Sequence, residues 1–531
     1  MRFDFITIFP EYFEPLHLSL LGKAERSQRL SWHVHNLRDW THDKHQSVDD
    51  TPLGGGAGMV MRPDIWGNAI DQVLADSPAA QRVVLAIPTP AGKLLDQRLV
   101  ENLATADQIV VACGRYEGID ARVAEHYRRR SQGALQGRLQ ESWQEPQEST
   151  NQAATSRAAM GQSAMDQSAC ANADFASGAS ANGIPANNAN SDPVTLEVLE
   201  FSLGDYVLNG GEIAGLVLAE AIGRLLDGVV GNPESLVEES HSSLGLLEYP
   251  VFTRPRNWRE LSVPEVLLTG NHGQIDRFRR TQSLRRTAFT RPDLLAKIPQ
   301  DQLNSQDREV LAQAGWLIKP EVKPVRFRLA QESDMAQVAE LAAATFPLAC
   351  PDFVPEAQIQ EFIREHLQES ELLRLMREEN ARIYVAEIGT IGTVGAVGAA
   401  RKTDATGEFD ANSALEATSA AEKTGEFIAY TLTLPTLEED LPNCPPGASY
   451  LSKCYTALRF HGSGVSGALI EFAVEDARQA YNCAAIALGT NIGNSRAQKF
   501  YKRHDFKRVG RRKFLVGETE NLDDVFVREL S

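Results

Sequence analysis

The sequence has 531 residues, which exceeds the size of one ordinary domain and predicts about two to four domains. Its formal net charge of −18 argues against a chain that binds nucleic acid over its whole surface, because phosphate binding requires clustered Lys and Arg. The sequence shows no signal peptide, no transit peptide and no apolar run that could span a bilayer, so we expect a soluble cytoplasmic protein without membrane contact.

Short apolar runs rich in β-branched residues predict the buried strands of the first part of the chain. FDFITIF (3–9), RVVLAIP (82–88) and QIVVAC (108–113) fit this pattern, and loops rich in Gly or Pro follow them. Helical patterns separate these runs, which indicates an α/β fold with a largely parallel sheet. Ligands of such sheets usually bind at the carboxyl ends of the strands.

A change of composition interrupts this pattern between residues 128 and 193. Gln, Ser, Ala, Asn and Gly dominate the segment, and aromatic residues nearly vanish. Because such a segment cannot bury enough apolar surface to order itself, we expect a disordered insertion in one loop. It could hang in solvent, regulate access to a site or bind a partner. The strand-like run LEVLEF (196–201) then resumes the α/β pattern.

Three segments around glycine clusters carry the first functional signal. They read THDKHQSVDDTPLGGGAGMVM (41–61), QIVVACGRYEGID (108–120) and FSLGDYVLNGGE (201–212). Glycine permits positive φ or a close approach of the backbone to a ligand. Two such loops after two strands of one sheet could form a pocket lined by peptide groups, which suits a cofactor read by its base edge and ribose. None is a dinucleotide or P-loop motif, so nicotinamide cofactors and ATP are poor candidates.

Taken together, these segments resemble the bacterial tRNA (guanine-N1)-methyltransferases that act on guanine 37, a family of the SPOUT superfamily. The similarity continues through GVVGNPES, LLEYPVFTRP, VPEVLLTGNH and QSLRRTAFTRPDLL, and covers residues 1–127 and 195–296. The resemblance implies a trefoil-knotted α/β domain over residues 1–231 and a homodimer whose active site spans two subunits. It also implies methyl transfer from S-adenosylmethionine to N1 of guanine 37 in tRNA, which gives 1-methylguanosine.

The resemblance further implies which residues hold the cofactor. They are Pro90, Gly114, Tyr116, Glu117, Gly118, Ser202, Leu203, Gly204, Tyr206, Leu208, Gly210 and Gly211. Glu117 would lie near the methyl-transfer centre, and members of the family also use Mg²⁺. We expect no structural metal site, because the six cysteines form no C-x-x-C pair and no His cluster completes a ligand set.

Methylation at N1 of guanine requires a base, since N1 is nucleophilic only after its proton leaves. A carboxylate can take this proton, and a guanidinium can stabilise the charge that spreads to O6. The resemblance assigns these roles to Glu239 and Arg224, although Arg224 alone reads as a surface helix residue. The family usually has Asp where Glu239 stands, and the extra methylene moves the carboxylate by about 1 Å, which can cost about 10²-fold in rate. Glu238 is an alternative base.

An acidic, Ser-rich flexible linker at 232–248 leads into a helical pattern at 249–318 that carries a strip of arginines. A basic strip on an acidic protein can bind RNA, although a solvated helix face is the commoner fate of a charge run. The resemblance implies a helical domain that holds the tRNA anticodon stem-loop, whose target base must leave its stack. The expected RNA-binding residues are Arg277, Arg279, Arg280, Arg285 and Arg286.

The last part of the chain, residues 325–531, begins with the strand VRFRLA and contains a loose insertion at 402–425. In LRFHGSGVSGALIEFAVEDA (458–477), a Gly-rich loop stands between an apolar strand and an amphipathic helix, which can form an anion site. The layout resembles the GNAT family of acetyl-CoA-dependent N-acetyltransferases, an α+β fold.

The GNAT resemblance implies roles for six residues. Arg459, Gly462, Gly464 and Gly467 would cradle the pyrophosphate of coenzyme A, Asn494 would contact the cofactor, and Tyr501 would protonate the leaving thiolate. The family often has Gly-Phe after the tyrosine helix, where this chain has Asp505-Phe506. A degenerate domain kept for binding is the alternative, and the acetyl acceptor is not indicated.

The sequence therefore predicts a tRNA methyltransferase with its own RNA-binding domain, fused to an N-acetyltransferase. The alternative is a non-catalytic tRNA-binding scaffold in which acetyl transfer is the main activity.

Overall fold

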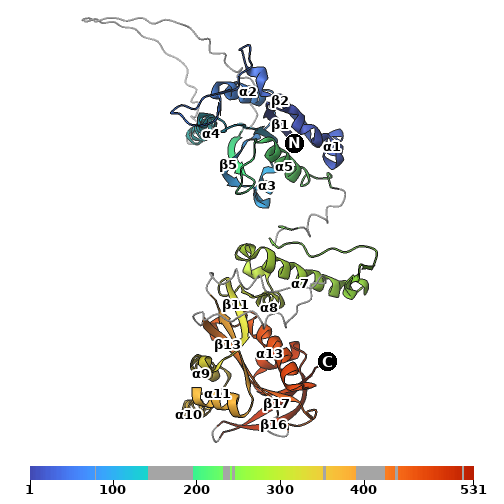
Figure 1. The fold of residues 1–531 in the computed structure, drawn as a ribbon, viewed down its shortest axis with the longest axis vertical. Helices are drawn as coiled ribbons and strands as arrows, with labels where there is room; N and C mark the ends of the chain where they lie inside the picture. The colour runs from blue at the N-terminus through green and yellow to red at the C-terminus, as the bar shows by residue number, and fades with distance from the viewer. Residues whose placement is uncertain are drawn as a thin grey trace, which may run out of the picture. The chain divides into compact units, whose positions relative to one another are not determined.

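The computed structural model divides the chain into two compact units, Met1–Leu236 and Val237–Ser531 (Figure 1). The structure describes residues 1–77, 79–141, 195–230, 240–241, 245–350, 354–389, 425–436, 441–516 and 519–530. The proposed base Glu239, residues 142–193 of the first predicted insertion and residues 402–424 of the second lie outside these ranges. Among the described helices, none is long and apolar enough to cross a membrane.

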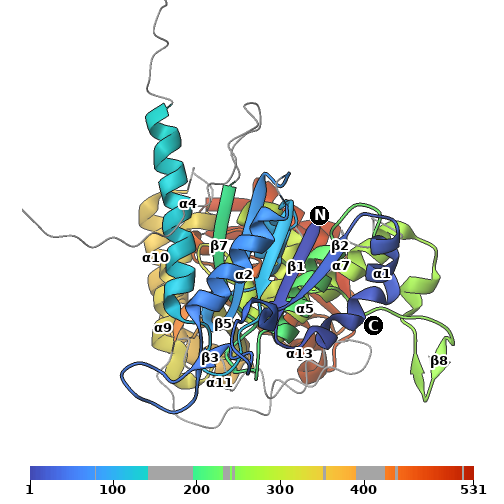
Figure 2. The same cartoon turned by 90° about the horizontal axis from the view of Figure 1, so that it is seen from above.

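A five-stranded sheet forms the centre of the N-terminal unit. Its strands are β1 (Arg2–Thr7), β2 (Ser31–Asn36), β5 (Arg82–Leu94), β6 (Gln108–Ala112) and β7 (Thr195–Ser202). They lie in the order β2-β1-β6-β5-β7, and every pair is parallel (Figure 2). All the strands predicted from apolar runs fall in this sheet, which confirms an α/β fold with a parallel sheet.

Helices cover both faces of this sheet. The helices α1 (Ser19–Arg26), α3 (Gln97–Leu103) and α5 (Glu212–Gly223) share one core with Phe3 and Phe5 of β1. The helices α2 (Pro63–Ala75) and α4 (Ala121–Glu141) share the other core with Ile6. Alternate residues of a strand point to opposite faces, so a strand covered on both faces is apolar throughout. Burial on both faces therefore explains the continuous apolar runs in the sequence.

Helix α4 corrects the predicted start of the first insertion. The helix continues past residue 128 to Glu141, where the sequence predicted disorder. Arg128 forms an ion pair with Glu200 of β7, and Ser131 Oγ donates a hydrogen bond of 2.5 Å to the Leu196 carbonyl. Gln, Arg and Ala favour helices when a neighbouring element offers contacts. Composition alone therefore predicted the boundary too early.

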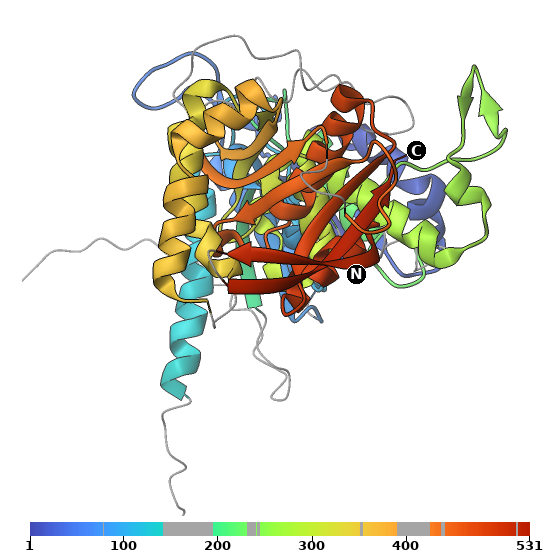
Figure 3. The same cartoon turned by 90° about the horizontal axis from the view of Figure 1, so that it is seen from below.

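An eight-stranded sheet forms the centre of the second unit, in the order β10-β11-β12-β13-β14-β15-β17-β16. Figure 3 shows its later strands in orange and red. Its strands are β10 (Trp316–Leu317), β11 (Lys323–Leu329), β12 (Arg382–Ile388), β13 (Glu426–Leu434), β14 (Ser449–Thr456), β15 (Ala485–Asn491), β16 (Lys507–Val516) and β17 (Thr519–Glu529). All neighbouring pairs are antiparallel except β14 and β15, which are parallel.

Helices cover both faces of the second sheet. The helices α9 (Met335–Thr345), α10 (Glu356–His366) and α11 (Glu369–Glu378) share a core with β12, β13 and β14. Helix α13 (Val465–Tyr481) packs on the other face. Helix α14 (Ser495–Arg503) follows β15. Mixed layers of this kind fit the predicted α+β domain.

The helical segment that precedes this sheet belongs to the same compact unit. It contains the short hairpin β8 (Asn257–Trp258) and β9 (Leu261–Ser262), then α7 (His272–Thr290) and α8 (Ser305–Gln313). Arg280 of α7 donates hydrogen bonds of 3.2 and 3.0 Å to Asp307 of α8. Because β10 follows α8 directly and pairs with β11, the helical segment is continuous with the C-terminal sheet.

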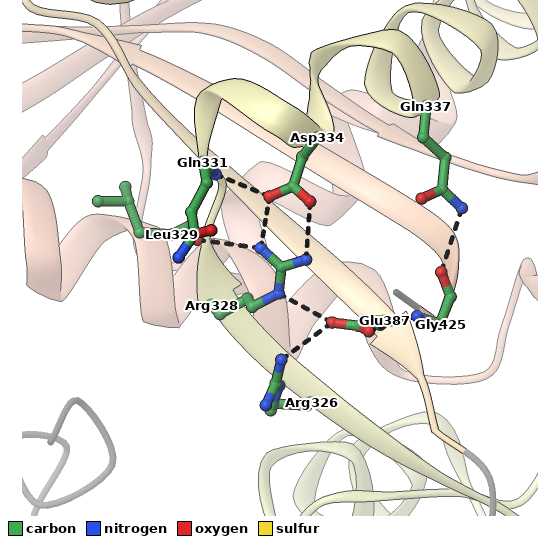
Figure 4. Close-up of polar contacts among 8 residues, drawn as sticks. All are labelled: Arg326, Arg328, Leu329, Gln331, Asp334, Gln337, Glu387 and Gly425. Carbon is green, nitrogen blue, oxygen red and sulfur yellow. Dashed lines mark hydrogen bonds and ion pairs between the residues drawn. The ribbon is translucent and has the colours of Figure 1, made fainter. Parts of the chain in front are cut away.

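A charged cluster fixes the first strands of this sheet to the start of α9 (Figure 4). Arg328 donates hydrogen bonds of 2.6 and 3.1 Å to Asp334, and one of 2.8 Å to Glu387. Burial opposes ionisation of Asp334, but the hydrogen bonds from Arg328 hold the pKa of this carboxyl below its usual range. Buried charges are tolerated only when paired in this way, so the cluster stabilises the edge of the domain.

Candidate functional site

A cavity of about 320 Å³ lies in the N-terminal unit at the carboxyl ends of β5, β6 and β7. This volume falls at the lower end of the range of small-molecule sites, about 300–1,000 Å³. The carboxyl edge of an open parallel sheet is the usual ligand position. The cavity therefore lies where the sequence predicted a ligand.

All but one of the predicted cofactor-binding residues line this cavity. They are Pro90, Gly114, Tyr116, Glu117, Gly118, Ser202, Leu203, Tyr206, Leu208, Gly210 and Gly211. The exception is Gly204, which lies beside it, since a Cβ atom there would be 2.7 Å from the Tyr206 ring. The structure thus brings together two loops that are about 90 residues apart in the sequence.

The two loops approach each other so closely that only glycine fits at their contact. A Cβ atom at Gly211 would lie 2.9 Å from the Cα of Cys113. Tyr116 and Gly118 adopt positive φ of 58° and 107°, which turns the first loop sharply around the cavity. Burial, with Glu212 nearby, raises the pKa of the Cys113 thiol, which stays protonated and is not a nucleophile at neutral pH.

A buried ion pair joins the same two loops. Arg115 Nε lies 3.0 Å from Glu212 Oε1 and 2.9 Å from Oε2, and the Glu212 carboxylate is 1% exposed. Thr7 Oγ1 donates a further hydrogen bond of 2.8 Å to Glu212 Oε1. The Arg115 guanidinium stacks 4.6 Å above the Phe9 ring and 5.2 Å from the Tyr12 ring. The pair therefore fixes the first loop to the start of α5.

The third glycine-rich segment packs against the cavity loop at Glu117. The Glu117 backbone N–H donates a hydrogen bond of 3.0 Å to the Met59 carbonyl. A Cβ atom at Gly58 would lie 2.3 Å from Glu117 Oε1. The segment 41–61 therefore supports the position of Glu117 and lies outside the cavity itself.

Arg224, the residue predicted to stabilise O6 of guanine, lies away from the cavity of its own chain. Arg224 caps the carboxyl end of α5, whereas the cavity lies at the amino end of this helix. A helix rises 1.5 Å per residue, so the two ends are about 18 Å apart. Glu239 lies outside the described residues, and its role stays a prediction.

The predicted RNA-binding arginines all lie on α7, but they differ in their contacts and in their exposure to solvent. Arg280 is held by Asp307, and Arg286 Nη1 donates a hydrogen bond of 3.2 Å to the Glu248 carbonyl. The Arg279 guanidinium lies 4.9 Å from the centre of the Tyr249 ring. Arg277 is exposed and Arg285 is half-buried. Some of these side chains thus stabilise the segment in addition to any contact with RNA.

A second, larger cavity of about 1070 Å³ lies in the C-terminal sheet. The parallel strands β14 and β15 pair only at Ser449–Ile486 and Tyr450–Ala487, and the later residues of both strands line the cavity. The separated ends of two parallel strands leave backbone groups free to bind an extended ligand. This opening lies in the domain that resembles the acetyltransferases.

The structure brings most of the predicted coenzyme A residues to this cavity. Gly462, Gly464, Gly467, Asn494 and Tyr501 line it, and Gly462 and Gly464 have φ of 78° and 89°. Asn494 also caps α14, since its side chain accepts a hydrogen bond of 3.0 Å from the Ala497 N–H. Burial raises the pKa of the Tyr501 phenol above its usual range, so the phenol stays protonated and can donate a proton.

Arg459 differs from the other predicted residues of this loop. It does not line the cavity, and its guanidinium pairs with Glu426 and stacks 4.7 Å above the Phe460 ring. Of the predicted residues of this loop, the three glycines therefore line the cavity and Arg459 does not.

Several residues in or beside the first cavity were not predicted from the sequence. Arg115 and Glu212 stand inside the quoted motifs, but nothing in the spacing shows that they pair. Glu200 also lines the first cavity, and a charged residue at the end of an apolar strand is a signal that could have found it.

Comparison with known proteins finds relatives of both units. A family model described as tRNA (Guanine-1)-methyltransferase TrmD matches residues 1–133 and 190–297, and a model of the acetyltransferase (GNAT) family matches residues 398–506. The tRNA (guanine-N(1)-)-methyltransferase of Kineococcus radiotolerans is 43% identical over 321 residues, which cover 60% of this chain and 92% of the relative. That of Arthrobacter sp. (strain FB24) is 46% identical over 318 residues, with the same coverage of 60% and 92%.

Proposed function

This chain belongs to the tRNA (guanine-N1)-methyltransferase family, and from that premise we propose that it methylates N1 of guanine 37 in tRNA. The methyl donor is S-adenosylmethionine, and the product is 1-methylguanosine next to the anticodon. The observation that carries the proposal is the convergence of the predicted cofactor residues on one cavity at the carboxyl edge of a parallel sheet.

The cavity suits S-adenosylmethionine in size and in the chemistry of its wall. Peptide groups of the loops at Gly114–Gly118 and Gly210–Gly211 can read an adenine edge and ribose hydroxyls without side-chain charge. The carboxylate of Glu117 lines the same cavity and favours a ligand that carries positive charge, whereas Glu200 is paired with Arg128. We propose that these loops follow the trefoil-knotted path of the family.

A homodimer is part of this proposal, because one chain does not complete the site. Arg224 lies at the far end of α5 from its own cavity, so it would act in the cavity of the partner subunit. The large apolar side chains of Ile213 and Val217 on α5 are 44% and 41% exposed, and Tyr12 is 41% exposed. Apolar residues left exposed together support an interface in this region.

The chemistry then follows from the groups that this chain supplies. Bound S-adenosylmethionine presents an electrophilic methyl group. Glu239 accepts the N1 proton of guanine, and Arg224 stabilises the negative charge that develops on O6. Among the described residues, no group of three or more His, Cys, Asp and Glu is arranged to hold a metal ion.

The arginines of α7 are proposed to hold the anticodon stem-loop. Arg277 and Arg286 are exposed on this helix, and exposed guanidinium groups bind phosphates with two hydrogen bonds each. Because the chain as a whole has a net charge of −18 and repels phosphates, we expect RNA to contact it at this local basic strip.

The test is transfer of labelled methyl groups from S-adenosylmethionine to an unmodified tRNA transcript, followed by digestion to nucleosides. The proposal expects label only in 1-methylguanosine. Label in another nucleoside, or no label although S-adenosylmethionine binds, would contradict it, and the second result would favour a non-catalytic tRNA-binding role.

We also propose that the C-terminal domain transfers acetyl groups from acetyl-CoA to an amine. Two observations favour this second activity: the separation of β14 from β15, and the glycine loop at the start of α13 beside Tyr501. Tyr501 is the proton donor to the leaving thiolate, and the cavity of about 1070 Å³ can hold the cofactor and an acceptor together. Release of coenzyme A thiol from acetyl-CoA in the presence of a panel of amines tests it. Thiol release that no amine increases would contradict the proposal.

A further inference from the structure

Helix α8 of the helical segment lies directly on the glycine loop of the acetyltransferase domain. A Cβ atom at Gly464 would lie 2.4 Å from the Arg308 carbonyl carbon, so backbone touches backbone at this point. A Cβ atom at Gly467 would lie 2.3 Å from Glu309 Oε2. Only glycine fits at position 464, whereas a Cβ atom at Gly467 would displace the Glu309 side chain. The proposed cofactor cradle therefore has a wall that comes from outside the acetyltransferase domain.

The first turn of α13 is the part of this cradle that attracts anions. The N–H groups at a helix start lack intrahelical acceptors, and the helix dipole adds partial positive charge there. The cations Arg496, Lys499 and Arg503 of α14 line the same cavity. Arg496 Nη1 lies 3.2 Å from His461 Nδ1, which ties α14 to the glycine loop. These cations and the helix start make this end of the cavity suited to bind phosphate groups.

Glu309 places an acid in the same cavity as these cations. It lines the cavity together with Ser305 of the same helix. Burial raises the pKa of the Glu309 carboxyl, while His504 on one side lowers it and Glu471 raises it further. A carboxylate beside a helix start occupies the position that favours a phosphate.

His504 holds the carboxylate there weakly. Its Nε2 lies 3.7 Å from Glu309 Oε2, and Nε2 is buried without a hydrogen-bond partner among the described residues. The other ring nitrogen, Nδ1, is engaged at 2.7 Å by Glu471, which Arg528 also binds at 2.9 Å. The Glu309 carboxylate is therefore not held by a strong ion pair, and its negative charge can repel an anionic ligand in the cavity.

We propose that Glu309 determines the affinity of the acetyltransferase domain for coenzyme A, because its carboxylate competes with the cofactor's diphosphate for the start of α13. The inference rests on the proposed acetyl-CoA function of this domain. Through Glu309, the helical segment that carries the arginine strip sets how strongly the cofactor binds.

The test is calorimetric titration of the full-length protein and its variants with coenzyme A at low salt. Replacing Glu309 by Gln removes one charge beside a diphosphate, and we expect binding about tenfold tighter. Glu309→Ala shifts affinity in the same direction, so a folding defect of one variant does not decide the result. Two controls outside the cavity lining keep the affinity within about twofold: Gln306→Ala, an exposed residue of the same helix, and Glu378→Gln, an exposed acid paired with Arg374.

The outcomes separate the two proposals. Unchanged or weaker binding by both Glu309 variants, while the wild type binds coenzyme A, would overturn the role of Glu309 and leave the acetyltransferase proposal intact. Binding by the Glu309 variants but not by the wild type would support the competition strongly. Absence of binding by the wild type and all variants would overturn the cradle and the acetyl-CoA function with it.

Discussion

Replacement of Arg115 by Met tests whether the buried ion pair holds the two cofactor loops together. The change leaves the Glu212 carboxylate, 1% exposed, with Thr7 as its hydrogen-bond donor at 2.8 Å. Breaking a buried pair by removal of one partner costs about 3–5 kcal/mol, because a charge stays buried without compensation. A loss of this size lowers the melting temperature of a unit of this length by about 10 °C.

The assay is differential scanning calorimetry of the full-length protein, with the N-terminal transition identified by its shift on addition of S-adenosylmethionine. Arg122→Met is the matched control, since Arg122 pairs with Asp120 on the same stretch of chain but is 71% exposed. Exposed ion pairs contribute little to stability because solvent screens them, so the control should lower the transition by at most about 3 °C. Equal, small shifts for Arg115→Met and Arg122→Met would refute the reasoning.

Three further results are expected. Gly210→Ala inserts a Cβ atom 2.3 Å from the half-buried Arg115 guanidinium and should weaken S-adenosylmethionine binding about tenfold or more in calorimetric titration, whereas Gly67→Ala, with nothing within 4 Å, should leave it unchanged. Glu239→Gln should lower the rate of methyl transfer by about 10²-fold or more at unchanged cofactor affinity, and equal loss with Glu238→Gln would contradict the assignment. Tyr501→Phe should lower kcat of acetyl transfer about 10²-fold. Because the raised pKa of Tyr501 keeps its phenol protonated, the wild-type rate should show no loss from Tyr501 titration up to about pH 9. A loss of rate with an apparent pKa near 8 would contradict its role as proton donor.

Much of the N-terminal sheet could be predicted because its strands are buried on both faces. After their first residue, the runs at 82–88 and 108–113 are continuously apolar, and short apolar runs of this kind are typical of buried strands. The strand β2 was missed, because its sequence SWHVHN is polar and it lies at an edge of the sheet. Edge strands need fewer apolar residues, so their sequence carries a weaker signal.

The loops around the cofactor cavity were predicted from glycine clusters, but the side chains that hold them were not. Arg115 and Glu212 are far apart in the chain, and their pairing depends on the order of the strands in the sheet. Similarly, no pattern in α8 indicates that Glu309 meets Gly467, because the contact joins segments that looked like separate domains. Tertiary pairing of polar groups is therefore the part that sequence patterns leave open.

For Arg224, in contrast, the sequence context indicates the position of the residue but not its proposed role. Its sequence context indicates a surface position at the end of a helix, and the structure confirms that it is exposed there. The role on guanine that we propose for it depends on a partner subunit, which no pattern within one chain describes.

Methyl transfer to a pair of tRNA transcripts that differ only at position 37 tests the central claim most directly. The proposed function predicts that a transcript with guanine 37 accepts labelled methyl groups from S-adenosylmethionine, and that replacement of this guanine by adenine abolishes incorporation. Equal incorporation into both transcripts would show that the enzyme modifies another position, and would contradict the claim.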